Sequence, residues 1–265
     1  MEQTAQVFKG LKPHILHGNS KYDKNHHTLI STLQTAYRRD INPDVIIIDE
    51  IHYGYSGKMI KELINNRDEI QIIGLSATPY DESGNLLDGF DVILNKYDIK
   101  YMIDNGYLVP IRSFILTKPD LSNVNIIAGD YDVNELGRIV CDNNTIMEIV
   151  SSTKEFIEKS KKTIIFAVDI NHAELLSQAY KHAGFTTTAL HSKLSKDDIK
   201  FEIDRFKKGY TKVLVSVLML TTGFDVPETD VAVIARPTRS QNLYKQMVGR
   251  IARLAVNKKY GILLD

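Results

Sequence analysis

The sequence predicts an α/β fold with parallel sheets in two domains, on the basis of three observations. Short apolar runs rich in β-branched residues recur along the chain, amphipathic segments separate them, and acidic or hydroxyl residues follow several of them. Runs that are apolar throughout are typical of strands buried on both faces of a parallel sheet. We expect strands within residues 44–50, 71–76, 111–116, 163–168, 186–190, 212–217, 231–235 and 261–264.

The segments between the later runs carry apolar residues three and four positions apart, as in residues 146–157 and 173–180. This spacing predicts helices that bury one face, and strands alternating with helices favour right-handed βαβ units. Residues 118–144 have only weak periodicity, and we interpret them as a connecting excursion between the domains. The expected division is a first domain over residues 1–108, a junction and connector over 109–150, and a second domain over 151–265.

The composition excludes several classes of protein. Hydrophobic residues make up 43% and charged residues 25% of the 265 residues, which supports a packed core and excludes a disordered tail or a fibre. Lys plus Arg and Asp plus Glu both number 33, so net charge does not indicate a nucleic-acid or membrane partner. Cys141 is the only cysteine, which excludes an intrachain disulfide and a cysteine-rich metal site. Without a signal-peptide pattern or a bilayer-length apolar run, we expect a soluble protein of the cytoplasm.

An acidic pair, Asp49 and Glu50, follows the most hydrophobic run. Open α/β sheets bind ligands at the carboxyl ends of their strands. Asp49 is therefore a candidate to hold a hydrated Mg²⁺ that carries nucleotide phosphates, and Glu50 a candidate to orient and deprotonate an attacking water. The alternative is an ordinary strand end with solvated charges, and the pair alone does not decide between the two.

Hydroxyl-bearing residues follow three other predicted strands. Ser76 and Thr78 come directly after residues 71–76 and precede a proline, which ends a strand by removing a ladder donor. His191-Ser192 follows residues 186–190, and residues 220–227, which include Gly223 and Asp225, follow residues 212–217. Each site alone also fits an ordinary strand-to-turn junction, whereas the joint pattern favours a binding site.

A cluster near the C-terminus carries two arginines. Gln246, Gly249, Arg250 and Arg253 are spaced i, i+3, i+4 and i+7, which places them on one face of a helix. Two arginines on one face form a permanently charged clamp suited to a transferring γ-phosphate, and Gly249 permits close approach of another backbone. The alternative is a basic surface helix.

In this order and spacing, the motifs resemble those of the superfamily 2 helicases and translocases, the DEAD/DEAH-like ATPases with two RecA-like domains. The resemblance is strongest to the branch of XPB-like helicases and type III restriction motors, including phage-encoded members. It extends to residues 30–35, which look like the family's Thr-x-Gln segment, and to residues 106–110, which are typical of the domain junction. It implies ATP and Mg²⁺ as cofactors and nucleic acid, DNA rather than RNA, as the partner, with a role in DNA repair or replication.

The resemblance also implies a role for each matching residue. Asp49 would hold Mg²⁺ and Glu50 would activate water, while Ile51 stands where the name-giving motif has Ala, a mild departure. Nucleotide state would be coupled to nucleic-acid grip by His52, Ser76 and Thr78. The second domain would contact the nucleotide through Gly223, Asp225 and Gly249, and would close over the γ-phosphate with Gln246, Arg250 and Arg253, the last being the expected arginine finger. The nucleic-acid backbone would be faced by Thr32, Gln34, His191, Ser192 and Thr221, which predicts grip without sequence preference.

One part of the family's pattern is not found in these residues. Superfamily 2 motors carry a Gly-rich loop ending in Gly-Lys-Thr or Gly-Lys-Ser before the acidic motif, whose amides and lysine hold the phosphates. The nearest match, residues 54–58, lies after the acidic motif, is too short and is followed by Met59. We therefore expect a first domain truncated at its N-terminus, and weak ATP binding unless a separate chain supplies the loop.

Three hypotheses follow. The first is a nucleic-acid-dependent ATPase of helicase or translocase type. The second is a non-catalytic nucleic-acid-binding remnant, or one half of a split motor. The third is the motor part of a restriction enzyme, whose nuclease would lie on another segment or subunit.

Overall fold

The computed structural model describes residues 1–16, 20–21, 25–39, 41, 43–51, 59–60, 62, 70–76, 85, 87, 90–94, 97–116, 119–217 and 225–265. The chain forms two compact units, unit 1 over Met1–Ile93 and unit 2 over Leu94–Asp265. This division lies before the predicted domain end at residue 108. None of the described helices is long and apolar enough to cross a membrane.

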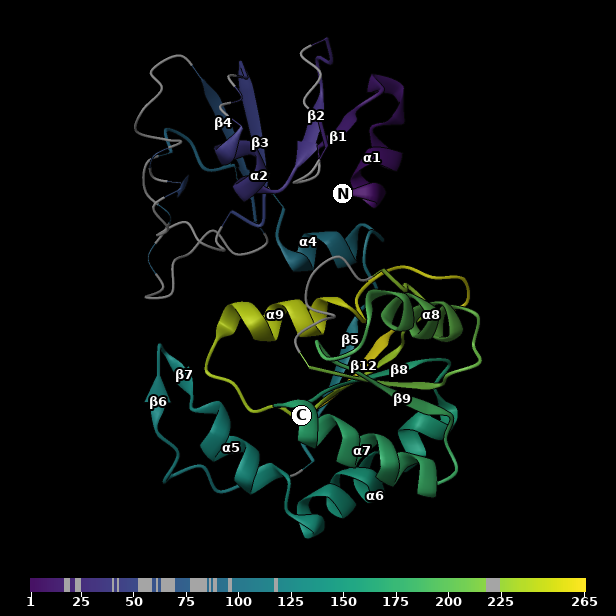
Figure 1. The fold of residues 1–265 in the computed structure, drawn as a ribbon. Coiled ribbons are helices and arrows are strands. Elements are labelled where there is room, and N and C mark those ends of the chain that lie inside the picture. Colours follow the sequence, from purple (N-terminus) through teal and green to yellow (C-terminus); the bar gives the residue numbers. More distant parts are fainter. Residues whose placement is uncertain are drawn as a thin grey trace. The chain divides into compact units, whose positions relative to one another are not determined.

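Unit 1 contains two small parallel sheets (Figure 1). One pairs β1 (His14–Leu16) with β2 (Leu29–Ser31), and the other pairs β3 (Val45–Asp49) with β4 (Gln71–Leu75). A buried cluster of Ile51, Ile60 and Leu87 forms its core, with Leu33, Ile48 and Phe90 packed against it. The helical elements described here are α1 (Glu2–Val7), η1 (Lys9–Leu11) and α2 (Leu33–Arg38).

The expectation that every apolar run is buried on both faces was wrong for β3 and β4. Burial alternates along both strands, so that one face packs on the core of unit 1 and the other is open. On the open face, Val45 is 45% exposed, Ile47 59%, Ile73 46% and Leu75 48%. Ile47 and Ile73 are register partners across the two strands, so these side chains form one continuous apolar surface.

Unit 2 is built on a six-stranded parallel sheet in the order β5-β12-β11-β8-β10-β9. The predicted strands in this half of the chain are confirmed, and β8, β10 and β11 are buried along their whole length. The strand bounds are β5 (Ile111–Phe114), β8 (Thr163–Phe166), β9 (Thr187–Leu190), β10 (Val213–Ser216), β11 (Val231–Ile234) and β12 (Gly261–Leu264).

Helices cover both faces of this sheet (Figure 1). On one face, α6 (Asn143–Lys159) and α7 (Ile170–His182) pack through residues such as Ile146 and Leu176 on Val215 and Val233. On the other, α8 (Lys196–Lys207) and α9 (Gln241–Gly249) contribute Phe206 and Met247. The side chain of an Asp or Ser residue caps the first turn of each of these helices, which fixes where the helix begins. A further helix, α4 (Ile99–Asp104), precedes β5.

The excursion after β5 is part of unit 2 and not a connector between units. It holds a hairpin of β6 (Ile126–Ile127) and β7 (Asp130–Tyr131), followed by α5 (Val133–Val140). Val124, Leu136 and Val140 pack against Val168 at the end of β8. The Asp130 carboxylate accepts hydrogen bonds from Thr238 Oγ1 and the Arg239 N–H, both at 2.7 Å, which ties the hairpin to the loop before α9.

Candidate nucleotide site

The acidic motif sits at the end of β3, as predicted. Asp49 is the last strand residue and is exposed, and Glu50 has a φ of 52°, so the chain leaves the strand in a left-handed turn. Asp49 Oδ1 accepts the Glu50 N–H at 3.0 Å, and the Ile51 N–H donates to the Leu75 carbonyl at 3.0 Å. A left-handed conformation is uncommon for a residue with a side chain and concentrates at functional sites.

Asp49 fits the magnesium role that the resemblance implies. Mg²⁺ keeps several waters and takes one or two carboxylates plus substrate phosphates, so one exposed carboxylate at a strand end is sufficient. Among the described residues there is no cluster of three His, Cys, Asp or Glu side chains that could hold a metal ion. A site of this kind therefore depends on the nucleotide for most of its ligands.

Ile51, in the position where the family's name-giving motif has Ala, packs into the core of unit 1 and is 2% exposed. Its neighbour on β4 is Gly74, at which an added Cβ would lie 3.0 Å from Ile51 Cγ2 and 3.1 Å from Phe90 Cζ. The larger side chain at position 51 is therefore accommodated by the absence of one at position 74.

Two predicted nucleic-acid-facing residues of unit 1 lie at the start of α2. Thr32 is the N-cap, and its Oγ1 accepts the Thr35 N–H at 3.3 Å. Both Thr32 and Gln34 are exposed. Ser76, predicted to couple the two sites, follows β4 directly and is half-buried. The predictions for His52, Thr78, Thr221 and Gly223 lie outside the described residues.

The expectation of one helical face for the C-terminal cluster was wrong for Arg253. Helix α9 ends at Gly249 with Arg250 as its C-cap, and Arg253 lies beyond it in an antiparallel bridge with Leu108. Beyond the helix, the Ala252 carbonyl accepts the Val109 N–H at 2.8 Å. Gln246 and Arg250 stay on the helix end and are 9% and 8% exposed.

Arg253 forms an ion pair with Asp225, which approaches from a different loop. The two side chains are 35% and 59% exposed, so the pair lies at the surface of unit 2. Gly249 is exposed, and no described residue lies within 4 Å of the position where its Cβ would be. Among the described residues of unit 2, therefore, no neighbour requires glycine at this position.

His191 and Ser192 follow β9 as predicted, but their side chains differ in exposure. The His191 imidazole is buried, 6% exposed, and its Nε2 lies 2.8 Å from Glu174 Oε1 on α7. Ser192 is exposed. A contact of His191 with nucleic acid would have to involve its backbone or a movement of its ring.

Three lysines around the loop that follows Asp225 were not predicted from the sequence. Lys258 donates to the Pro227 and Thr229 carbonyls in this loop, Lys161 to the Val256 carbonyl, and Lys162 to the Lys207 carbonyl at the end of α8. The available signal was positional, since a lysine pair directly precedes β8 and another lies just before β12.

A parallel sheet with this strand order, helices on both faces and polar groups at its ends defines a RecA-like α/β domain. Two family models match the chain: "Type III restriction enzyme, res subunit" over residues 1–81 and "Helicase conserved C-terminal domain" over residues 143–255. The chain belongs to the superfamily 2 helicases and translocases.

Curated relatives agree with this assignment. "Putative ATP-dependent helicase IRC3" of Saccharomyces cerevisiae is 30% identical over 98% of this chain and 40% of its own length. The "51.5 kDa protein" of a Lactococcus phage is 27% identical over 84% of this chain and 49% of its own length. The chain thus spans less than half the length of these relatives.

Solved structures show the same fold. One is titled "The fragment structure of a putative HsdR subunit of a type I restriction enzyme from Vibrio vulnificus YJ016", with a TM-score of 0.75, 24% identity, and coverage of 99% of this chain and 51% of that chain. Another, Dbp5 of Saccharomyces cerevisiae bound to RNA and ADP BeF3, has a TM-score of 0.62 at 16% identity, with coverage of 100% of this chain and 68% of that chain.

Proposed function

We propose that this chain supplies the hydrolytic and coupling residues of an ATP-dependent motor that moves on nucleic acid, with DNA as the preferred partner. The observation that carries the proposal is the ion pair of Arg253 with Asp225. The family resemblance assigns both residues to the nucleotide, they come from separate loops, and their charges meet at an exposed position. In this proposal, the ion pair holds the Arg253 side chain close to the position where a γ-phosphate would bind.

The residues of unit 1 supply the other half of the chemistry. Asp49 is proposed to hold Mg²⁺, which would neutralise phosphate charge when bound with ATP. Glu50 is proposed to take the proton of the attacking water as general base. Arg253 would exchange Asp225 for the γ-phosphate, assisted by Gln246, Arg250, Gly223 and Gly249. Nucleotide state is proposed to be coupled to nucleic-acid binding by His52, Ser76 and Thr78.

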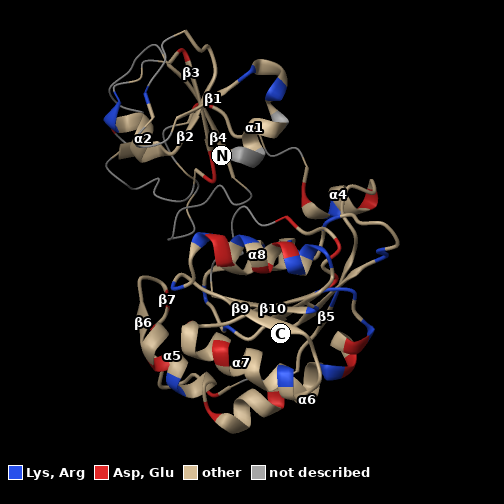
Figure 2. Ribbon diagram, turned by 45° about the vertical axis from the view of Figure 1, so that its right-hand side comes forward, with Lys and Arg blue, Asp and Glu red and all other residues tan. Residues whose placement is uncertain are grey.

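Nucleic acid is proposed to contact the loops that follow the strands. The candidates are Thr32, Gln34, His191, Ser192 and Thr221. Contacts through hydroxyls and backbone amides go mainly to phosphate, so binding would be insensitive to sequence and weakened by salt. Charge of both signs alternates along α8 (Figure 2), which makes that helix a poor phosphate surface. The preference for DNA follows from the resembled branch of the family, and a cytoplasmic role in DNA repair or replication is proposed on the same ground.

The test is ATP hydrolysis by the purified chain, with and without DNA or RNA. Because the chain is expected to bind ATP weakly without the phosphate-binding loop, we expect hydrolysis only when a segment carrying that loop is supplied. We expect DNA to stimulate it more than RNA and Glu50→Gln to abolish it. Glu148→Gln, which changes an exposed carboxylate on α6, is the matched control and should hydrolyse at the wild-type rate. Hydrolysis that persists in Glu50→Gln would exclude Glu50 as the base.

A second candidate function is favoured by the open apolar face of β3 and β4. Parallel strands are normally covered on both faces, and Val45, Ile47, Ile73 and Leu75 are each 45% to 59% exposed. We propose that a segment carrying the phosphate-binding loop, on a separate chain, covers this face. Without it, the chain would be a non-catalytic nucleic-acid-binding module.

The two candidates differ in a binding experiment. The module predicts salt-sensitive DNA binding that neither ATP nor Arg253→Ala changes, whereas a motor predicts that ATP alters DNA affinity and that Arg253→Ala removes the effect. Translating the gene upstream of Met1 adds a second criterion, because a strand followed by Gly-x-Gly-Lys-Thr there would favour the complete motor.

A further inference from the structure

Two loops, which lead into the neighbouring strands β12 and β11 of the six-stranded sheet, carry the Arg253–Asp225 pair. The first, residues 250–260, connects α9 to β12 and holds Arg253. The second, residues 225–230, leads into β11 and holds Asp225. The position of Arg253 therefore depends on how these two loops are held relative to each other.

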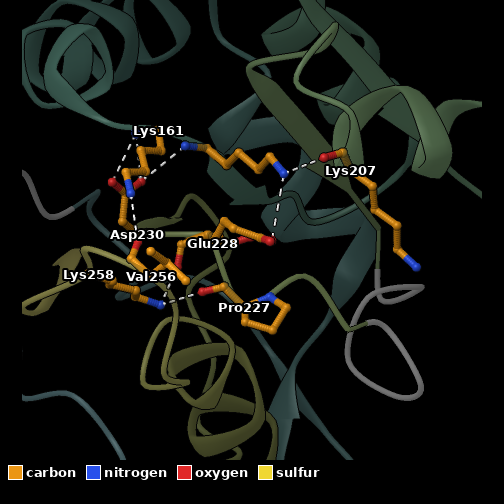
Figure 3. A network of polar contacts seen from close by, with 9 residues as sticks. Lys161, Lys207, Pro227, Glu228, Asp230, Val256 and Lys258 are labelled. Atoms are coloured by element: carbon orange, nitrogen blue, oxygen red, sulfur yellow. Dashed lines mark hydrogen bonds and ion pairs between the residues drawn. The ribbon is translucent and has the colours of Figure 1, made fainter.

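Lys258 makes a second connection between the same two loops (Figure 3). Its Nζ donates to the Pro227 carbonyl at 2.9 Å and to the Thr229 carbonyl at 2.6 Å. Arg253 and Lys258 thus both reach from the first loop to the second. Arg253 contacts Asp225 at the start of the second loop, and Lys258 contacts Pro227 and Thr229 further along it. The Lys258 contacts go to backbone, so they fix the path of the chain and not only one side chain.

The second loop is in turn fastened to the sheet. The Asp230 carboxylate accepts the Lys161 N–H at 3.0 and 2.9 Å and the Lys162 N–H at 3.1 Å. The amine of Lys162 lies 3.7 Å from Glu228 Oε2, and its side chain is 10% exposed. The amine of Lys161 donates to the Val256 carbonyl at 2.9 Å, so that Lys161 joins the first loop to Asp230 in the second. Figure 3 shows these contacts converging on the two loops.

We propose that Lys258 is a positioning residue for Arg253, which keeps the two loops at the spacing from which Arg253 reaches either Asp225 or the γ-phosphate of a bound nucleotide. The proposal rests on the proposed function, in which Arg253 acts on ATP. When Arg253 leaves Asp225, the ion pair no longer joins the loops, and the connections through Lys258 and Lys161 remain. A preformed geometry of this kind lowers the cost of orienting a catalytic group.

The charges around Lys258 agree with this role. The pKa of Lys258 is lowered to about 8, mainly by burial; Asp230 opposes this effect, the positive charge of Arg253 adds to it, and Glu228 opposes it. Arg253 and Lys258, both on the first loop, therefore lie close enough for their charges to interact. Lys162, which also reaches a carbonyl in this network, approaches from the start of β8 and does not join the two loops.

The test compares Lys258→Met with Lys258→Arg, using the complete chain. Lys259→Met, which removes the exposed neighbouring lysine, is the matched control. The readout is the ¹³C NMR signal of Arg253 Cζ, assigned with the Arg253→Lys variant, because a role confined to stability would not move it in folded protein. Where the wild-type chain hydrolyses ATP, kcat and KM are measured on the same variants.

We expect Lys258→Met to displace the Arg253 signal, Lys258→Arg to restore it and Lys259→Met to leave it unchanged. We also expect Lys258→Met to lower kcat roughly tenfold with little change in KM, since a misplaced group costs rate and not ground-state binding. If Lys258→Met does not fold, Lys258→Gln, which keeps one donor, is measured in its place.

An Arg253 signal that is unmoved in folded Lys258→Met or Lys258→Gln would overturn the proposal. So would failure of Lys258→Arg to restore it. A wild-type chain without ATP hydrolysis, even when a segment carrying the phosphate-binding loop is supplied, would count against the proposed function alone, because the NMR comparison does not depend on turnover.

Discussion

Ile51 and Gly74 show how a change in a motif residue is accommodated by one neighbour. Ile51 is buried beside the acidic pair, and the glycine on β4 leaves the space that its Cγ2 fills. The pair thereby keeps β3 and β4 in register just where Asp49 and Glu50 emerge. The pattern of apolar residues predicted the strand, but the match between the two residues depends on cross-strand packing that spacing does not reveal.

Gly74→Ala should destabilise unit 1, because the new methyl group would press on Ile51 and Phe90. Overpacking of this kind costs about 1–3 kcal/mol. Ile51→Ala should cost less stability in the Gly74→Ala chain than in the wild type, because it also makes room for the new methyl group, which a double-mutant cycle in urea measures. The matched control is Gly10→Ala, since nothing lies within 4 Å of its Cβ position. Additive losses in the double variant would rule out this packing relation.

His172 gives unit 2 a stability that depends on pH. It is fully buried, its Nδ1 accepts the Val168 N–H at 3.3 Å, and burial lowers its pKa to about 4, against an opposing effect of Asp169. The unfolded chain binds the proton near pH 6.5 and the folded chain only near pH 4. Stability from this residue is therefore complete above pH 6.5 and is lost as the pH falls to 4, by up to about 3 kcal/mol.

The measurement for His172 is the unfolding free energy of unit 2 across that range of pH. His172→Asn, whose amide oxygen can still accept the Val168 N–H, should flatten the profile between pH 4 and 6.5. His182→Asn changes an exposed histidine at the end of the same helix and should leave the profile as in the wild type. An equally steep profile in His172→Asn would show that other groups cause the loss.

At the level of elements, the sequence located the strands of unit 2 better than the ends of its helices. The buried strands are short apolar runs, whereas the helices that cover them are amphipathic. The end of α9 was misplaced because the bridge from Arg253 to Leu108 is a contact between distant segments. The hairpin was missed because two-residue strands carry no periodic signal.

At Gly249 in helix α9, one substitution can test a role in function without lowering the stability of unit 2. Gly249 is the last helical residue and is exposed, and no atom of the described residues lies within 4 Å of its Cβ position. Gly249→Ala should leave the stability of unit 2 unchanged or raise it by up to about 1 kcal/mol, because Ala favours helix. DNA-stimulated ATP hydrolysis should nevertheless fall if another backbone approaches this residue. Wild-type hydrolysis in a variant of unchanged stability would remove that role from Gly249.

At the level of the whole molecule, the two units differ in how completely they are packed. Strands β8, β10 and β11 are fully buried between helices, whereas β3 and β4 expose one apolar face. Composition and periodicity could not predict this difference, because the runs in both units read alike. What separates them is the presence of covering segments, which is a property of the tertiary fold.

We therefore expect the two units to open at different free energies, with unit 1 the less stable. Hydrogen exchange followed by mass spectrometry should show faster exchange of amides in β3 and β4 than in β8, β10 and β11. Phe206→Ala removes a fully buried ring of unit 2, at a cost of about 3–5 kcal/mol, and should accelerate exchange in unit 2 alone. Gly74→Ala should act on unit 1 alone. If either variant accelerates exchange equally in both units, the chain unfolds as one cooperative body, and the open face of β3 and β4 does not set the stability of unit 1.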